Sequence, residues 1–208
     1  MRPWLRVCIA GFLGAIAMFL WASIAHLATP LASVGVGQID REAPLLKEMH
    51  STLGAGAGLY VFPRMTGQDE DAMKAYAVRL KANPSGLLVY HPPGASMLET
   101  SQLVTEFLGE LVQCLIVAVL LAWAAIAGYW LRIGFVGLIG AAAALTTNLS
   151  YWNWYGFPGD YTLAFAGIEW LGYIAAGLVI AAVLPRNIPD GLWRVTETEL
   201  AITVSNGP

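Results

Sequence analysis

The chain has 208 residues, of which 57% are hydrophobic and only 12% are charged. Soluble domains carry about 25% charged residues, and a surface in water must stay substantially polar, so this composition excludes an ordinary soluble protein. The net charge of −3 excludes a broad basic surface for nucleic acid. The two cysteines, Cys8 and Cys114, give no disulfide framework and no metal-ligand spacing.

Four segments are apolar and long enough to be helices that cross a hydrocarbon core, which takes roughly 20 residues. They are residues 7–27, 107–131, 133–149 and 161–184. The second and the fourth each contain one acid, Glu110 and Glu169, and Pro185 ends the fourth. We therefore expect a membrane all-α protein: a four-helix transmembrane bundle with a small α/β extracytoplasmic cap. Its parts are residues 1–28 (first helix), 29–105 (cap), 106–185 (second to fourth helices) and 186–208 (cytoplasmic tail).

Basic residues near the ends of the spans predict the orientation of the chain. Two basic residues precede the first span, one lies between the second and third, and two follow the fourth: Arg2, Arg6, Arg132, Arg186 and Arg194. If the chain crosses the membrane four times, all five lie on the same side. We expect that side to be the cytoplasm, so the chain would cross a bacterial inner membrane with both termini in the cytoplasm. An alternative stays open, in which residues 1–25 are a secretory signal cleaved after Ser23-Ile24-Ala25. Three spans would then remain, in the same orientation.

The segment between the first two spans has a soluble composition and predicts an αβαβ cap. The expected helices are residues 42–53 and 69–81, and the expected strands are residues 59–63 and 87–90. A strand, a helix and a strand within roughly 30 residues predict a right-handed βαβ unit, in which the strands are parallel. Two strands alone are marginally stable, so the cap is expected to lean on the membrane, on the spans or on another chain.

Three stretches of sequence carry a family resemblance: residues 58–63 (GLYVFP), 86–92 (GLLVYHP) and 152–162 (WNWYGFPGDYT). On these motifs, residues 1–185 resemble a group of small, uncharacterised bacterial inner-membrane proteins. The resemblance implies the bacterial setting and the topology, and it implies no activity.

Polar side chains gather in what would be the outer leaflet, whereas the inner leaflet has almost none. They are His26 in the first span, Glu106, Glu110 and Gln113 at the second, Asn148 in the third and Glu169 in the fourth. Glu169 would lie about 10 Å deep at 1.5 Å per residue, and a charge there is costly. We expect it to be protonated or hydrogen-bonded to His26, Gln113 or Asn148. Structural roles for the set, such as capping a helix or reaching the surface, remain the alternative.

The predicted outer turn, residues 151–161, contains six aromatic residues in eleven positions. These rings either anchor a helical hairpin at the interface, or Trp152 and Trp154 form a floor for a lipid headgroup, a quinone or a cation. Small residues in the third span, Gly137/Ala141 and Gly140/Ala144, predict close helix packing, either within the chain or with a partner.

No catalytic, nucleotide-binding or metal-binding motif is present in the sequence. We therefore expect a non-enzymatic accessory or assembly subunit, which engages a larger membrane complex or another copy of itself through the cap and the outer-leaflet faces. Membrane lipid is an expected partner, nucleic acid is not, and the sequence identifies no cofactor. The alternative function is a small-ligand site for a quinone or a lipid around Glu169 and the Trp-rich turn. A proton-linked transporter is the third hypothesis.

Overall fold

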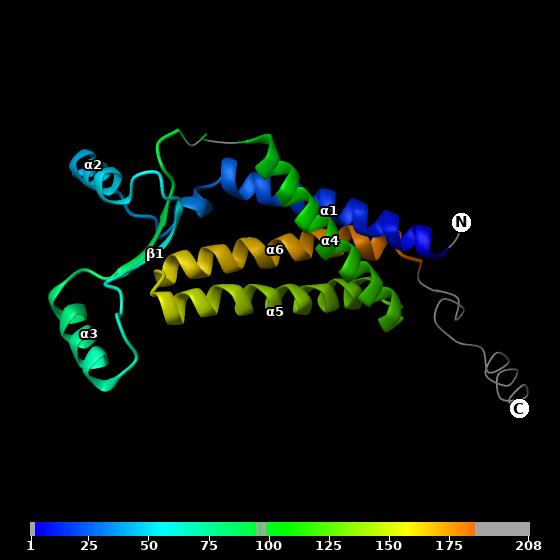
Figure 1. Cartoon of the computed structure of the whole chain (residues 1–208). Coiled ribbons are helices and arrows are strands. Elements are labelled where there is room, and N and C mark those ends of the chain that lie inside the picture. The colour runs from blue at the N-terminus through cyan, green and yellow to red at the C-terminus, as the bar shows by residue number, and fades with distance from the viewer. Residues whose placement is uncertain (1–2, 95, 97–98, 186–208) are drawn as a thin grey trace, which may run out of the picture.

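The computed structural model describes residues 3–94, 96 and 99–185, and these form four long helices with a small cap at one end (Figure 1). The long helices are α1 (Pro3–Leu27), α4 (Thr100–Ala124), α5 (Tyr129–Tyr155) and α6 (Gly159–Val183). Each is long and apolar enough to cross a membrane, so the prediction of four such helices is confirmed. The predicted tail, residues 186–208, lies outside the described residues, as do Arg2, Arg186 and Arg194.

The helix ends differ from the predicted spans at both turns. The turn between α4 and α5 is residues 125–128, so Arg132 lies in the first turns of α5 and not between the spans. Hydropathy could not place this turn because its sequence, AIAG, is itself apolar. At the other turn α5 continues through Tyr155, and the chain reverses at Gly156 with a φ of 71°. Most of the predicted outer turn is therefore helix.

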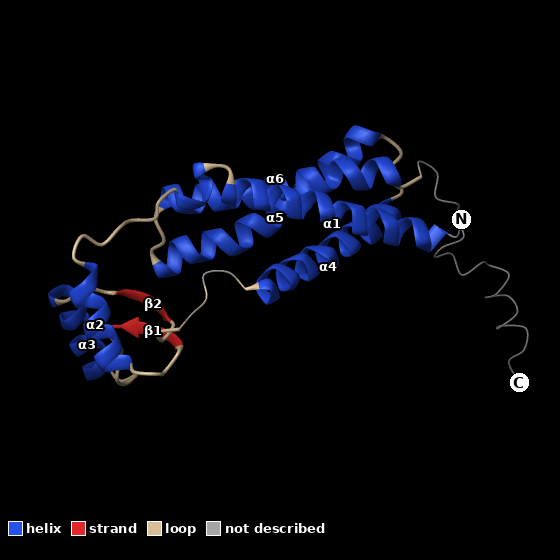
Figure 2. Cartoon of the chain, turned by 90° about the horizontal axis from the view of Figure 1, so that it is seen from above, coloured by secondary structure: helices blue, strands red, loops and turns tan. Residues whose placement is uncertain are grey.

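The four helices pack in the order α4, α1, α6, α5, with α1 between α4 and α6 (Figure 2). A smaller contact joins α4 to α5. Close approach of α5 and α6 depends on Gly140, since a Cβ there would lie 2.4 Å from the Cβ of Tyr173. Gly137 likewise faces α6, where a Cβ would lie 2.8 Å from Ile174 Cδ1. The small residues predicted on the third span thus serve packing within the chain.

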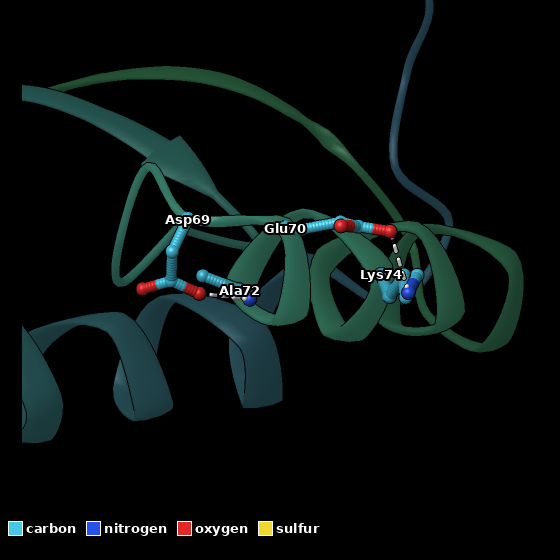
Figure 3. Close-up of polar contacts among 4 residues, drawn as sticks. All are labelled: Asp69, Glu70, Ala72 and Lys74. Atoms are coloured by element: carbon cyan, nitrogen blue, oxygen red, sulfur yellow. Dashed lines mark hydrogen bonds and ion pairs between the residues drawn. The ribbon is translucent and has the colours of Figure 1, made fainter.

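The cap contains η1 (Pro30–Ser33), α2 (Glu42–Leu53), β1 (Gly58–Phe62), α3 (Glu70–Ala82) and β2 (Gly86–Tyr90), in the predicted αβαβ order. Asp69 begins α3 by accepting a hydrogen bond from the backbone N–H of Ala72 at 2.8 Å, and Glu70 pairs with Lys74 one turn on (Figure 3). Acidic residues at the start of a helix are favoured by the helix dipole, which is why the sequence located this helix well.

The pairing of the two strands contradicts the predicted βαβ unit. The strands are antiparallel, with Leu59 opposite Val89 and Phe62 opposite Gly86. Because β1 ends where β2 begins, α3 is an insertion in a hairpin and not a crossover above a sheet. The prediction of parallel strands is wrong, and the physical reason is that antiparallel pairing is the more stable arrangement when only two strands are present.

Candidate functional site

A polar pocket of about 200 Å³ lies between α1, α4 and α6, toward the cap end, where α1 ends and α4 and α6 begin. The polar side chains that line it are His26 from α1, Glu106, Glu110 and Gln113 from α4, and Glu169 and Tyr173 from α6. The structure thus brings together five of the six polar residues that the sequence placed in the outer leaflet, all but Asn148. We call this site the polar pocket.

The two acids deepest in the polar pocket lie at matching positions along their helices. Glu110 and Glu169 each follow the first residue of their helix by ten positions, which is about 15 Å at 1.5 Å per residue. Glu106 lies one turn closer to the cap end than Glu110 and shares its face of α4 by i, i+4 spacing. The pocket therefore has carboxyl groups at its mouth and on two of its walls.

Hydrogen bonds between helices fix the walls and the floor of the pocket. Tyr173 Oη donates to Gln113 Oε1 at 2.9 Å, which closes the floor between α6 and α4. Trp21 Nε1 donates to the backbone oxygen of Ile168 at 2.8 Å and joins α1 to α6. At the mouth, His26 Nδ1 lies 2.9 Å from the backbone oxygen of Ala22, within its own helix.

Glu169 has a partner on a neighbouring helix. Asn148 Nδ2 donates to Glu169 Oε2 at 3.0 Å and to the backbone oxygen of Ala144 at 2.9 Å. Asn148 is one of the three partners that the sequence suggested for this acid. The bond orients the Glu169 carboxyl group and engages one of its two oxygens.

Glu110 differs from the other acids of the pocket because one of its oxygens is buried without a hydrogen bond. Its side chain is only 4% exposed, and its Oε2 has no hydrogen-bond partner among the described residues. Buried polar atoms are nearly always hydrogen-bonded, so an exception of this kind needs an explanation. An unoccupied acceptor that lines a pocket marks the place where a donor is needed.

The two tryptophans of the predicted site lie elsewhere. Trp152 lines an apolar groove of about 330 Å³ between α5 and α6, which also includes Leu145, Asn148 and Leu163. Trp154 is 78% exposed and lines neither hollow. Because α5 is still helical here, residues two positions apart cannot share a face. The expected Trp floor beside the carboxyl groups is therefore not formed.

Other aromatic residues of this region make a continuous row of ring contacts. The ring of Phe157 stacks on Tyr151 with centroids 5.3 Å apart, Phe157 contacts Tyr161 at 5.4 Å, and Tyr161 stacks on Phe165 at 4.2 Å. The row then reaches His26, whose ring meets Phe165 edge-on at 5.9 Å. These rings tie the α5–α6 turn to α1 and have a structural role.

Sequence reasoning missed two members of the polar pocket, Trp21 and Tyr173. Tyr173 follows Glu169 by four positions, so helical spacing alone would have placed both on one face. Trp21 carries no such signal, because its role depends on how α1 meets α6.

A buried cation at the opposite end of the helices was also missed. Arg132 is 3% exposed and donates hydrogen bonds to the backbone oxygens of Ile126, Ala181, Leu184 and Pro185. Arg132 is an exception to the prediction that this end holds almost no polar groups, since the sequence named it only as a signal of orientation.

Metal binding is not supported within the described residues, where no group of three His, Cys, Asp or Glu side chains is placed to hold an ion. No protein-family model, no curated protein and no solved structure matches this chain. The polar pocket offers acceptors and negative charge to a small ligand that carries donors.

Proposed function

We propose that this protein is a multi-pass inner-membrane protein that acts as a non-enzymatic accessory or assembly subunit and binds a partner polypeptide through its cap. The observation that carries the proposal is that many large apolar side chains of the cap are exposed. Neither α2 nor α3 contains a buried residue. A domain of this kind gains little stability from a core of its own, so a partner is the natural source of the missing contacts.

The membrane setting rests on the outward faces of the four long helices. Large apolar residues such as Leu131, Leu138 and Leu163 are highly exposed on them, which suits contact with lipid and not with water. Arg6 and Arg132 lie at the end opposite the cap. With the bias of basic residues toward the cytoplasm, this supports cytoplasmic termini and an extracytoplasmic cap.

The docking surface we propose is one face of the two-stranded ribbon. Leu59, Val61 and Val89 alternate along β1 and β2, share this face through the pairing of Leu59 with Val89, and are 63%, 56% and 63% exposed. Both strands also have a free edge, since the sheet has two strands. An apolar face with open edges suits a partner that adds a strand or covers the face.

The test is the size of the native assembly. The tagged full chain is extracted from its own membrane in a mild detergent and analysed by native electrophoresis, with mass spectrometry of the co-purifying proteins. We expect the wild type to migrate in a larger assembly and the double change Leu59→Lys with Val61→Lys to release it. Met73→Lys with Val78→Lys, which puts the same two charges on exposed apolar positions of α3, is the matched control. A wild-type monomer with nothing attached would contradict the proposal.

A second candidate function, a site for a lipid chain or a quinone, is favoured by the apolar groove beside Trp152. The groove is walled by apolar surface of α5 and α6, which suits a hydrocarbon chain. Leu145→Trp would fill the groove, and Leu138→Trp would add the same ring on the exposed face of α5. We expect the first change alone to reduce the lipid or quinone that co-purifies, measured by mass spectrometry; equal retention in both variants would remove this candidate.

A further inference from the structure

We propose that the polar pocket between α1, α4 and α6 is a binding site for a small organic cation, namely a primary ammonium ion with a short alkyl chain. The site is separate from the ribbon face of the cap and from the groove beside Trp152. The inference therefore stands whether or not the protein has a partner polypeptide.

The charge of the pocket selects a cation. Glu106, Glu110 and Glu169 all line it, and no lysine or arginine does so among the described residues. Arg132 is no counter-ion for these acids, because it lies at the other end of the helices and bonds to backbone oxygens there. Carboxylates gathered in a partly buried site repel one another, and a bound cation relieves that repulsion.

The hydrogen-bonding needs of the pocket select a donor with several protons. Glu110 Oε2 is buried without a partner, and Glu169 has one of its two oxygens engaged by Asn148. A carboxylate only accepts hydrogen bonds, whereas an ammonium group donates three. One ammonium group therefore supplies the donor that Glu110 Oε2 lacks and has protons left for a second acceptor of the pocket.

The size and the walls of the pocket select an organic ion over a metal. No group of acidic, His or Cys side chains among the described residues is placed to hold a metal ion. A volume of about 200 Å³ is below the range of about 300–1,000 Å³ that accommodates drug-sized ligands. Met18, Trp21 and Tyr173 supply apolar wall for an alkyl chain, and the polar atoms of both rings are already hydrogen-bonded. Aromatic rings beside a cation add to its binding.

The route into the pocket runs from the cap end. His26 and Glu106 are exposed and lie nearest that end, whereas the bond between Tyr173 and Gln113 closes the floor. A ligand that arrives on the cap side meets the carboxyl group of Glu106 first and that of Glu110 next. This order suits capture of a cation from the aqueous phase.

The experiment is a calorimetric titration of the purified full chain, in detergent or in nanodiscs, with n-propylammonium chloride. The comparison ligands are sodium chloride at equal ionic strength, n-propanol, which has the same chain without the charge, and sodium propionate, which has the opposite charge. We expect saturable binding of one propylammonium per chain and no saturable heat from the other three. Heat from propylammonium that matches sodium chloride or propanol would overturn the proposal.

Substitutions then locate the site. Glu110→Gln keeps the shape of the side chain and removes its charge, so we expect the affinity for propylammonium to fall by at least about tenfold, because charge-assisted hydrogen bonds are about twice as strong as neutral ones. Glu48→Gln on the exposed surface of α2 makes the same change far from the pocket and should leave the affinity unaltered.

A second variant keeps the test decisive if Glu110→Gln does not fold. Glu106→Gln changes an exposed side chain at the mouth, and we expect a smaller loss of affinity, about two- to fivefold, consistent with a more hydrated charge. Elution volume in size-exclusion chromatography establishes that each variant is folded. Wild-type affinity in a folded Glu110→Gln variant, or in Glu106→Gln where Glu110→Gln does not fold, would overturn the assignment of the site.

Discussion

Replacing Arg132 tests whether a side chain of α5 holds the end of α6 in place. Its Nε donates to the backbone oxygen of Ile126 at 2.6 Å, and its Nη1 donates to those of Ala181 and Leu184 at 3.2 and 2.7 Å. Its Nη2 donates to the backbone oxygen of Pro185 at 2.7 Å. One guanidinium group thus joins the α4–α5 turn to the end of α6.

The end of α6 needs hydrogen-bond donors, because its last backbone oxygens have no partner within the helix. The last carbonyls of any helix lack a partner in the next turn. Here the shortage is worse, because the partner of Ala181 would be residue 185, and proline has no N–H. A positive charge also suits the negative end of the helix dipole. Arg132 meets all three needs at once.

The expected cost of losing these bonds follows from their number and burial. Arg132→Met leaves several carbonyl oxygens without a donor, each costing about 1–3 kcal/mol if it stays buried. Water that enters at the helix end can donate to some of these oxygens and lower the cost. We therefore expect the free energy of unfolding to fall by about 3–5 kcal/mol. Arg132→Lys keeps the charge but not the planar set of donors, and we expect about half that loss.

The assay is unfolding in mixed micelles with increasing sodium dodecyl sulfate, followed by tryptophan fluorescence and repeated from the unfolded side to establish reversibility. Arg6→Met is the control, because Arg6 is exposed at the same end of the helices, and an exposed change of this kind should stay within about 0.5 kcal/mol. If Arg132→Met unfolds at the same midpoint as Arg6→Met, Arg132 does not stabilise the end of α6.

Three further predictions use the same folded protein. Gly140→Ala should lower the free energy of unfolding by about 1–3 kcal/mol, because the added methyl group clashes with α6. Gly134→Ala, which has open space around it, should raise that free energy by up to about 1 kcal/mol. Both values come from the unfolding midpoints in the same mixed-micelle assay. Asn148→Leu should cost about 1 kcal/mol in that assay by removing the hydrogen bond to the α6 carboxyl group, and an unchanged midpoint would show that the bond adds nothing. Cys8 should react with a maleimide in the folded protein and Cys114 only after unfolding, as mass spectrometry of labelled peptides will reveal.

The long helices were predictable because their signal is physical and local. Roughly 20 apolar residues in a row have few alternatives to a helix of membrane length, and all four were found. The ends of these helices were less predictable, since hydropathy does not distinguish the apolar turn before Gly128 from the helix it interrupts. The aromatic residues after Leu149 caused the opposite error, because the helix there is longer than predicted. They look like a turn by composition, yet nothing in them breaks a helix before Gly156.

The strand pairing in the cap shows a second kind of limit. The sequence located both strands and the helix between them, because local propensity and turn residues determine those elements. Whether β1 and β2 run parallel or antiparallel depends on where the chain returns, and α3 is long enough to allow either. The prediction failed at the step that depends on the tertiary arrangement of the cap.

The candidate site was predictable as far as helical spacing reaches. Glu106 and Glu110 share a face by their separation of four, and the depth of Glu169 was deduced from its distance to the start of its span. The link from Glu169 to Asn148 needed two helices to be placed, and the sequence offered it as one of three options. The separation of Trp152 from the acids followed from the unexpected length of α5, so that error came from the helix boundary and not from the chemistry.

Arg132 and Glu110 are the buried basic and acidic side chains among the described residues of the helices, and they show how a structural charge differs from one that binds a ligand. Both are at most 4% exposed, so burial alone does not separate them. Their hydrogen bonds do. Arg132 donates to four backbone oxygens that the fold itself leaves without partners, and a group used in this way has a structural role. Glu110 has a buried oxygen that the described part of the chain does not satisfy, and this oxygen lines a pocket with two other carboxyl groups. Burying this oxygen costs energy, and it forms no hydrogen bond that stabilises the fold. Binding of a cationic ligand would explain why the acid is there.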